Sequence, residues 1–414
     1  MTLRSAIACG MVVAGALVAW IALTPSPKTK TLLAETGGER ARDGIQPPET
    51  ADGSASTIPP AGASPAQDQI GATGRGFLMG FTSWPYAATA EAVQGTYAFI
   101  GTNADLLVEH LDDGVPWAES LRNTPFPKAF QEKIEGRRKN RSPGTKLLLS
   151  LTPLNLGRNG LAECAGNGQR PPLPAELKGK PFNDPELVRA YANYCRRMVE
   201  FFQPDFLVTG IESNELLNNQ PKAWNAYREL SRQVQGELRE RFPRLPLSES
   251  VTLHKLLDRQ NRGLAEYRKK IQEFVESHDF FAVSFYPFFL GLHQEEEFAE
   301  ALDFLPTFTG KPIAITETGH PAEPLKIRAW NLDFPTDPKE QAAFVKVLLS
   351  RAQAHHYLFV TYWAARDFDE LWKTFPDAVK DLGALWRDTG LIDEAGQPRP
   401  ASATWKSWLA RSRQ

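Results

Sequence analysis

The feature that most constrains the fold is an alternation of short apolar segments with longer amphipathic stretches between residues 76 and 414. Each apolar segment spans five to seven residues, which is typical of strands buried on both faces of a parallel sheet. The predicted strands are Phe77–Thr82, Asp105–His110, Lys146–Leu151, Phe206–Ile211, Leu245–Val251, Phe280–Phe285, Pro312–Thr316 and Tyr357–Tyr362. Helices are predicted most clearly over Asp184–Phe202, Lys222–Phe242 and Lys339–Ala354. Eight such units favour an α/β fold of the closed (β/α)8 TIM-barrel type over a doubly wound sheet, whose Gly-rich phosphate loop is missing after the first strand.

The segment before the barrel has a different composition. Residues 24–75 contain seven Pro and no aromatic residue, so they offer too little apolar surface to offset the entropy lost on folding. We expect residues 24–75 to be a disordered linker and residues 76–414 to form the catalytic domain, with the boundary near Gly76.

Residues 6–23 carry no charge and follow Arg4, which is the layout of a signal sequence or a membrane anchor within residues 1–23. Either alternative predicts export to a periplasmic or extracytoplasmic location. A signal sequence would give a secreted protein, and an anchor would give a membrane-anchored one. Leu17 or Trp20 would stand where a small residue is preferred before a cleavage site, so we favour an uncleaved anchor. Cys9 has the local surroundings of a lipidation site, but the apolar run that should precede it is missing.

Composition excludes several classes of function. The chain has 47 Lys and Arg against 49 Asp and Glu, and no basic block interleaved with aromatic residues, so nucleic acid is not an expected partner. Its three Cys exclude a disulfide scaffold and a Cys-based zinc site, whereas Cys164 and Cys195 could form one disulfide or remain two free thiols. No cofactor motif is present, although a loop-bound Ca²⁺ stays open. We expect a monomer that contacts a membrane only through its N-terminal segment.

The residues that follow the predicted strands are acidic. The fourth strand is followed by the sequence Glu212-Ser-Asn-Glu215, and the seventh by Glu317. These two strands stand on opposite sides of a barrel mouth, so two carboxylates would face each other across it. Glycoside cleavage needs such a pair, one group to protonate the leaving oxygen and one to attack the anomeric carbon. Either Glu alone would more simply be a solvated loop residue.

Aromatic residues follow two other predicted strands. Tyr286 follows the sixth strand, and its hydroxyl could orient a nucleophilic carboxylate. Trp363 follows the eighth strand, and its face could support a sugar ring. For each residue alone, ordinary packing in the core is the simpler interpretation.

Together these segments resemble a known clan. The sequences GIESNELL, AVSFYPFF, KPIAITETGHP and FVTYWAARD, with the C-terminal LGALWRDTGLIDEAGQPRPA, are similar to the strand and tail signatures of the retaining (β/α)8 glycoside hydrolases. Among these they look most like the endo-β-1,4-galactanases that cut arabinogalactan side chains. The resemblance covers most of residues 76–414.

The resemblance implies roles for individual residues. The acid/base falls on Glu215, and Asn214 before it corresponds to the residue that binds the sugar 2-hydroxyl. The nucleophile falls on Glu317. Tyr286 corresponds to the tyrosine that donates a hydrogen bond to the nucleophile, and Trp363 to the aromatic floor of the subsite.

The sequence also departs from the pattern. Glu212 is a rival acid, but Ile211 precedes it rather than Asn. Where the clan commonly has an Arg near the end of the second strand, this chain has His110 and Asp112, which could contact sugar hydroxyls, and His110 could equally be structural. Ser213 stands where the family usually has a Gly.

The connection Leu154–Asn183 is long for such a barrel. It could form a wall of the site with Asn155 and Arg158, or be a peripheral insertion.

The leading hypothesis is a retaining, endo-acting glycosidase that cleaves a β-linked, galactan-like polysaccharide by double displacement. Trp84, Trp117 and Trp363 would line an open groove, because a polymer must lie across the site. The acid Glu215 should have a raised pKa, and the two carboxyl groups should lie about 5 to 5.5 Å apart. The alternative is a non-catalytic carbohydrate-binding or scaffold protein on the same barrel.

Overall fold

The computed structural model describes residues 74–165, 171–327 and 332–414. The predicted N-terminal segment, and the linker up to residue 73, lie outside the described residues, as does Cys9. Within the described part of the chain, no helix is long and apolar enough to cross a membrane.

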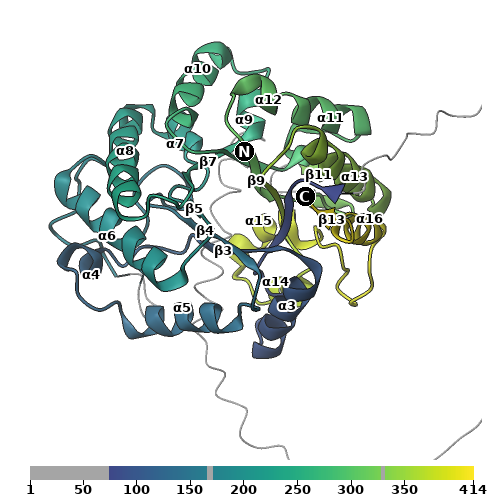
Figure 1. Cartoon of the computed structure of the whole chain (residues 1–414), viewed down its shortest axis with the longest axis horizontal. Coiled ribbons are helices and arrows are strands. Elements are labelled where there is room, and N and C mark those ends of the chain that lie inside the picture. Colours follow the sequence, from purple (N-terminus) through teal and green to yellow (C-terminus); the bar gives the residue numbers. More distant parts are fainter. Residues whose placement is uncertain (1–73, 166–170, 328–331) are drawn as a thin grey trace, which may run out of the picture. The chain divides into compact units, whose positions relative to one another are not determined.

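One parallel sheet forms the centre of the domain (Figure 1). Its strands are β2 (Leu78–Thr82), β3 (Leu106–Leu111), β4 (Lys146–Leu151), β5 (Phe206–Val208), β6 (Leu247–Ser248), β7 (Ser250–Thr252), β8 (Phe281–Phe285), β9 (Ile313–Thr318) and β12 (Phe359–Tyr362). They are ordered β6-β5-β4-β3-β2-β12-β9-β8-β7. The two end strands, β6 and β7, are separated in sequence only by Glu249, so the ring closes through one interrupted strand. The predicted TIM-barrel fold is confirmed.

Helices follow the strands along the chain, as a (β/α)8 barrel requires (Figure 1). They are α3 (Ala90–Asn103), α4 (Trp117–Arg122), α5 (Lys128–Asn140), α6 (Pro185–Phe202), α7 (Asn214–Asn219), α8 (Trp224–Arg241), α9 (Leu253–Leu257), α10 (Leu264–Val275), α11 (Glu295–Asp303), α12 (Leu305–Phe308), α13 (Pro338–Ala354), α14 (Asp369–Trp372), α15 (Asp377–Arg387) and α16 (Pro400–Leu409). Short 3-10 turns occur at η1 (Pro221–Ala223) and η2 (Pro287–Leu290), and β10 (Leu325–Ile327) pairs with β11 (Leu332–Phe334).

Local sequence sets where the main helices begin. Asp184 caps α6, because its side chain accepts the N–H of Glu186, and a Pro follows it at the first helical position. Asp337 caps α13 in the same way, by accepting the N–H groups of Lys339 and Glu340. These two helices and α8 match the predicted helices to within two residues at each end.

The strands are apolar on both faces because each face packs against a separate layer. On β4, Leu147, Leu149 and Leu151 belong to the large core between the sheet and the helices. Leu148 belongs to a second cluster that fills the barrel interior with residues such as Val108. This arrangement explains why the strands appear in the sequence as continuous apolar runs.

The folded domain begins before the predicted boundary at Gly76. The short strand β1 (Gly74–Arg75) pairs in parallel with β13 (Ser412–Arg413) near the C-terminus. Arg75 is buried, and its guanidinium lies 2.6 Å from the carboxylate of Asp105. The composition of the linker could not indicate this boundary, because the residue that anchors the chain is charged.

Cys164 and Cys195 are buried free thiols, so the second of the two alternatives for these cysteines applies. Burial raises the pKa of each thiol, which keeps both of them protonated and unreactive.

Candidate active site

A narrow cavity of about 20 Å³ lies at the mouth of the barrel, where the carboxyl ends of the strands meet. Carboxylates, one guanidinium, one imidazole and several aromatic rings line it. The lining residues are His110, Asp112, Arg158, Glu212, Tyr286, Phe289, Glu317, Trp363 and Trp386.

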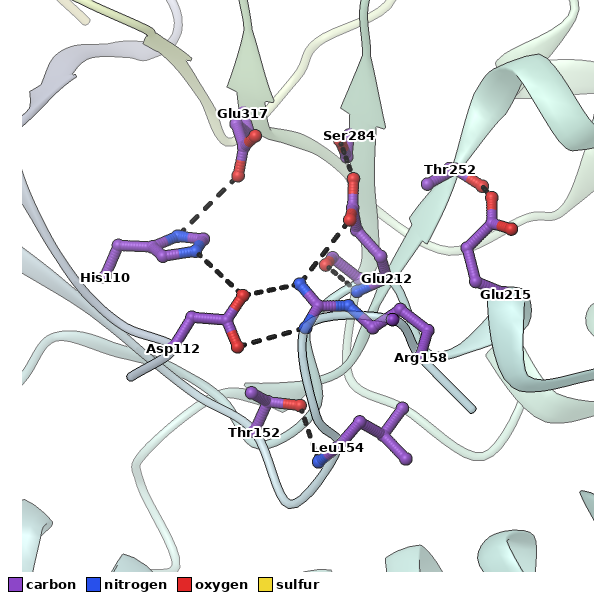
Figure 2. Close-up of polar contacts among 12 residues, drawn as sticks. His110, Asp112, Thr152, Leu154, Arg158, Glu212, Glu215, Thr252, Ser284 and Glu317 are labelled. Carbon is purple, nitrogen blue, oxygen red and sulfur yellow. Dashed lines mark hydrogen bonds and ion pairs between the residues drawn. The ribbon is translucent and has the colours of Figure 1, made fainter. Parts of the chain in front are cut away.

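Glu317 lies near the end of β9 and faces this cavity. Its Oε1 accepts a 2.6 Å hydrogen bond from the hydroxyl of Tyr286. Its Oε2 lies 3.6 Å from Nδ1 of His110, as Figure 2 shows. Burial and the charge of Glu317 raise the pKa of Tyr286 well above its usual value. The phenol therefore stays protonated and holds one carboxylate oxygen in place.

Glu212 follows β5 and reaches the same cavity. Its Oε1 accepts a 2.8 Å hydrogen bond from Ser284, and its Oε2 lies 3.5 Å from Nη2 of Arg158 (Figure 2). Burial, and next the negative charge of Glu317, raise the pKa of Glu212 to about 7 against the opposing effect of Arg158. Near neutral pH this carboxyl group is therefore able to donate a proton.

The loop that carries Glu212 is fastened to the interrupted strand β6–β7. Glu212 has a left-handed backbone with φ of 53°, and its N–H donates to the hydroxyl of Ser250 at 2.9 Å. The next residue, Ser213, donates from its hydroxyl to the buried carboxylate of Glu249 at 2.6 Å. Gly210 is required here, because a Cβ at that position would come within 2.2 Å of Glu249 Oε2.

Glu215 lies outside the cavity, in a separate buried cluster (Figure 2). Its Oε1 accepts a 2.8 Å hydrogen bond from Thr252, while His254 and Lys255 lie 3.5 and 3.6 Å from its two oxygens. Burial alone would raise the pKa of Glu215, but the adjacent His254 imidazole and the charge of Lys255 outweigh it, and the pKa is lowered. The raised pKa expected for Glu215 is therefore wrong, because the Lys255 ammonium, the His254 imidazole and the Thr252 hydroxyl all lie against this carboxylate.

Asn214 is held in the same cluster. Its amide nitrogen donates to the backbone and side-chain oxygens of Thr252, at 3.2 and 3.0 Å, and to the Tyr267 hydroxyl at 2.9 Å. Its amide oxygen accepts the N–H of Thr252 at 2.8 Å. With both ends of the amide engaged, Asn214 fixes the start of α7 to the end of β7 rather than facing the cavity.

His110 and Asp112 do reach the cavity, from the end of β3 and the residue just beyond it. They meet Arg158, which comes from the long connection after β4. The guanidinium of Arg158 binds both oxygens of Asp112, at 3.0 and 2.6 Å (Figure 2). The connection Leu154–Asn183 therefore contributes to the wall of the site through Arg158.

The same contacts shift the pKa of Asp112 and the pKa of His110. Burial opposes the charge of Asp112, but the charge of Arg158 and the nearby His110 imidazole lower the pKa of Asp112 overall. Burial likewise opposes the charged form of His110, but the nearby Asp112 and the charge of Glu317 raise its pKa.

The predicted aromatic residues are placed differently from one another. Trp363 lines the cavity, and Trp84 packs behind it with the ring centroids 4.8 Å apart. Trp117 is buried in the core, where its indole N–H donates to the carbonyl of Ala162 at 2.8 Å. The expectation that Trp117 lines an open groove is therefore wrong, because α4 packs its ring against α6.

Two further aromatic residues of the wall were not identified from the sequence. Phe289 comes from η2, and Trp386 comes from α15, far along the chain. Phe289 stands beside Tyr286 in the segment AVSFYPFF, which offers a weak signal. Trp386 has no signal of its own, because only the fold brings α15 to the cavity.

Carboxylates also gather beside the loop that follows β12. The groups close enough to share a metal ion are Glu323, Asp367 and Glu394, and Asp367, Asp369 and Asp388. Burial raises the pKa of Asp367 to about 8, although Arg399 pairs with it. The arginine already supplies a positive charge where a metal ion would bind.

Comparison with known proteins gives matches in structure. No protein family model matches the chain, and no curated protein matches it in sequence. The GH5_18 protein from Streptomyces cattleya, solved in complex with Manb1-4GlcNAc, superposes with a TM-score of 0.57 at 13% identity, over 80% of each chain. The exo-beta-1,4-mannosidase Op5Man5 from Opitutaceae bacterium strain TAV5 also gives 0.57 at 13% identity, over 81% of this chain and 60% of that one.

Xylanase 10B from Thermotoga maritima gives a TM-score of 0.51 at 14% identity, over 81% of this chain and 95% of that one. The chain has the fold of the (β/α)8 glycoside hydrolases. At such low identities the likeness shows the fold alone, and the resemblance to galactanases in particular stays a prediction.

Proposed function

We propose that the protein is a retaining glycoside hydrolase in which Glu317 is the nucleophile and Glu212 is the acid/base. The observation that carries the proposal is a pair of carboxyl groups in one cavity with different surroundings. Glu317 accepts a hydrogen bond from Tyr286, whereas burial and the nearby charge raise the pKa of Glu212 to about 7. The general acid must be protonated while the nucleophile is ionised, so the two carboxyl groups need different surroundings.

In the first step, Glu212 gives its proton to the glycosidic oxygen while a carboxylate oxygen of Glu317 attacks the anomeric carbon. The bond from that carbon to the leaving oxygen breaks, and a covalent glycosyl ester forms on Glu317. Tyr286 holds one oxygen of Glu317, which leaves the other to attack. Trp363 supplies an apolar face for the ring of the sugar.

In the second step, Glu212 acts as a base. Esterification removes the charge of Glu317, which is the second-largest influence raising the pKa of Glu212. The pKa of Glu212 then falls, so the group can accept a proton from an incoming water. Water attacks the anomeric carbon, and Glu317 is released as a carboxylate.

Glu212 takes the role that the sequence analysis gave to Glu215. Glu212 shares the cavity with Glu317, whereas Glu215 is paired with Thr252, His254 and Lys255. A carboxyl group whose pKa is lowered is a poor proton donor at neutral pH. Glu215 and Asn214 instead fix the loop on which Glu212 stands.

The substrate we propose is a β-linked glycan. Solved proteins with the same fold include an exo-beta-1,4-mannosidase and a xylanase, and one was solved with Manb1-4GlcNAc. The sequence signatures favour galactan within this class, and endo action follows from that resemblance. Export is proposed from the uncharged residues 6–23.

The test uses the full chain with β-1,4-galactan, β-1,4-mannan, β-1,4-xylan and Manβ1-4GlcNAc. We expect release of reducing ends from at least one of them, with the β-anomer appearing first in NMR spectra of the product. Glu317→Gln is the inactive control, and Glu295→Gln, at an exposed position on α11, is the matched control that keeps activity. Binding without any release by the unaltered protein would favour the non-catalytic alternative.

A further inference from the structure

A continuous chain of charged side chains joins the two carboxyl groups of the cavity (Figure 2). It runs from Glu317 to His110 at 3.6 Å, from His110 to Asp112 at 3.9 Å, from Asp112 to Arg158 at 2.6 Å, and from Arg158 to Glu212 at 3.5 Å. With His110 protonated and Glu212 ionised, charges of opposite sign alternate along the whole chain.

The chain is shielded from solvent. The side chains of Asp112 and Arg158 are 2% and 3% exposed, so water screens their charges only weakly. Arg158 is also fixed in position, because its Nη1 donates to the carbonyl of Asn155 at 3.1 Å. A change of charge at one end is therefore able to alter the pairing at the other.

We propose that His110, Asp112 and Arg158 couple the charge of Glu317 to the protonation of Glu212, as positioning residues for the two steps of the reaction. This proposal rests on the proposed function. When Glu317 becomes an ester, His110 loses one negative partner and turns toward Asp112. Asp112 then holds Arg158 less strongly, and the guanidinium stabilises Glu212 as the carboxylate that the second step needs.

Other groups face Glu212 and act in parallel. Glu317 raises its pKa directly through space, Ser284 donates a hydrogen bond to it, and Glu215 adds a weaker negative charge. On the other side, His110 meets the edge of Trp363 at a centroid distance of 6.0 Å. A decisive variant must break the chain while leaving these direct influences in place.

Asp112→Asn meets this condition, because it keeps the size of the side chain and removes only the central negative charge. The matched control is Asp113→Asn. Asp113 is the adjacent buried aspartate and pairs with Lys133 at 2.5 Å, outside the chain. Circular dichroism and thermal unfolding establish that both variants fold.

The first measurement follows the imidazole of His110 by NMR titration, which needs no activity. The protein has seven His, and the spectrum of His110→Gln assigns the signal. We expect Glu212→Gln to lower the titration midpoint of His110 by about half a pH unit, although the two side chains are not in contact. The same substitution made together with Asp112→Asn should have less than half that effect, whereas Asp113→Asn should leave it unchanged.

The second measurement compares two pH profiles for an aryl glycoside with a good leaving group. The profile of kcat/KM reports the first step of the reaction. The profile of kcat reports the second step. In Asp112→Asn, Arg158 is free to pair with Glu212 at all times, so the alkaline limb of kcat/KM should move down by at least half a pH unit. A purely structural role would lower both parameters together and leave the limb in place.

An unchanged His110 midpoint in Glu212→Gln would overturn the coupling, and so would an unmoved limb in a folded, active Asp112→Asn. If no glycoside is cleaved by the unaltered protein, the proposed function fails, and the His110 titration still decides whether the chain couples the two carboxyl groups.

Discussion

Glu212 and Glu215 lie three residues apart and are both buried, yet their surroundings have opposite effects. Glu212 shares its cavity with Glu317, and burial and that second charge raise its pKa to about 7. Glu215 is enclosed by Thr252, His254 and Lys255, which lower its pKa despite burial. The comparison teaches that burial favours the neutral acid only where no cation or donor outweighs it.

The two sets of surroundings also correspond to two roles: catalysis on the cavity side and stabilisation of the loop on the other side. The cavity side, with Glu212 and Glu317, is where a sugar can meet two carboxyl groups. The supporting side, with Asn214 and Glu215, binds the loop to the end of β7. Substitutions should therefore divide into those that abolish turnover and those that destabilise the fold.

The largest expected effect is on the cavity side. Glu317→Gln should reduce kcat by a factor of about 10⁴ or more, because an amide of the same shape is a poor nucleophile. Its melting temperature should stay within a few degrees of the unaltered protein, as measured by calorimetry. Retained activity in this variant would remove Glu317 from the mechanism.

The next effect concerns Glu212 and the pH dependence of stability. Its pKa in the folded protein, about 7, lies above the ordinary value of 4.5, so the folded state binds more protons between these values and loses stability as pH rises through them. Glu212→Gln has no such group to titrate. Its free energy of unfolding relative to that of the unaltered protein should therefore rise by up to about 3 kcal/mol between pH 4 and pH 8. Urea unfolding at a series of pH values measures it, and parallel curves for the two proteins would contradict the raised pKa.

Glu215 should give a smaller effect of opposite sign. Its lowered pKa stabilises the fold above the ordinary value of 4.5, and that contribution is lost as pH falls through the lowered pKa. Glu215→Gln should therefore lower the free energy of unfolding by about 2 kcal/mol at pH 7. This difference from the unaltered protein should become smaller at acidic pH. The same unfolding series tests this, with Glu266→Gln on the exposed side of α10 as control.

The smallest effect is expected from Tyr286→Phe. This change removes the hydrogen bond to Glu317 but keeps the ring, so kcat should fall about tenfold, which corresponds to about 1.4 kcal/mol. Steady-state kinetics measures the fall. A loss as large as that of Glu317→Gln would mean that Tyr286 does more than orient the nucleophile.

Much of the fold could be predicted because it depends on local patterns. Apolar runs such as Lys146–Leu151 mark strands buried on both faces, and that strand was predicted with its observed bounds. The residues near strand ends followed from the same reasoning, since Glu317, Tyr286 and Trp363 all line the cavity.

The remaining parts of the site depend on contacts between distant segments. Strand β5 ends at Val208, earlier than the predicted Ile211, so the strand gave no reliable register for choosing between Glu212 and Glu215. Arg158 reaches the cavity from a long connection, and Trp386 from a late helix, so no local pattern marks either one. Trp117 shows the reverse case, because an aromatic residue has the same appearance in sequence whether it packs in the core or lines a site.

The most direct test of the central claim compares Glu212→Gln with Glu215→Gln on β-glycosides that differ in leaving group, with and without azide. We predict that Glu212→Gln lowers kcat/KM by about 10² to 10⁴ for a poor leaving group and far less for a dinitrophenolate, because only the poor one needs the acid. Azide should restore turnover of the dinitrophenyl glycoside and give a β-glycosyl azide. Glu215→Gln should stay within tenfold on every substrate and be indifferent to azide. The opposite pattern, with azide rescue of Glu215→Gln alone, would contradict the account.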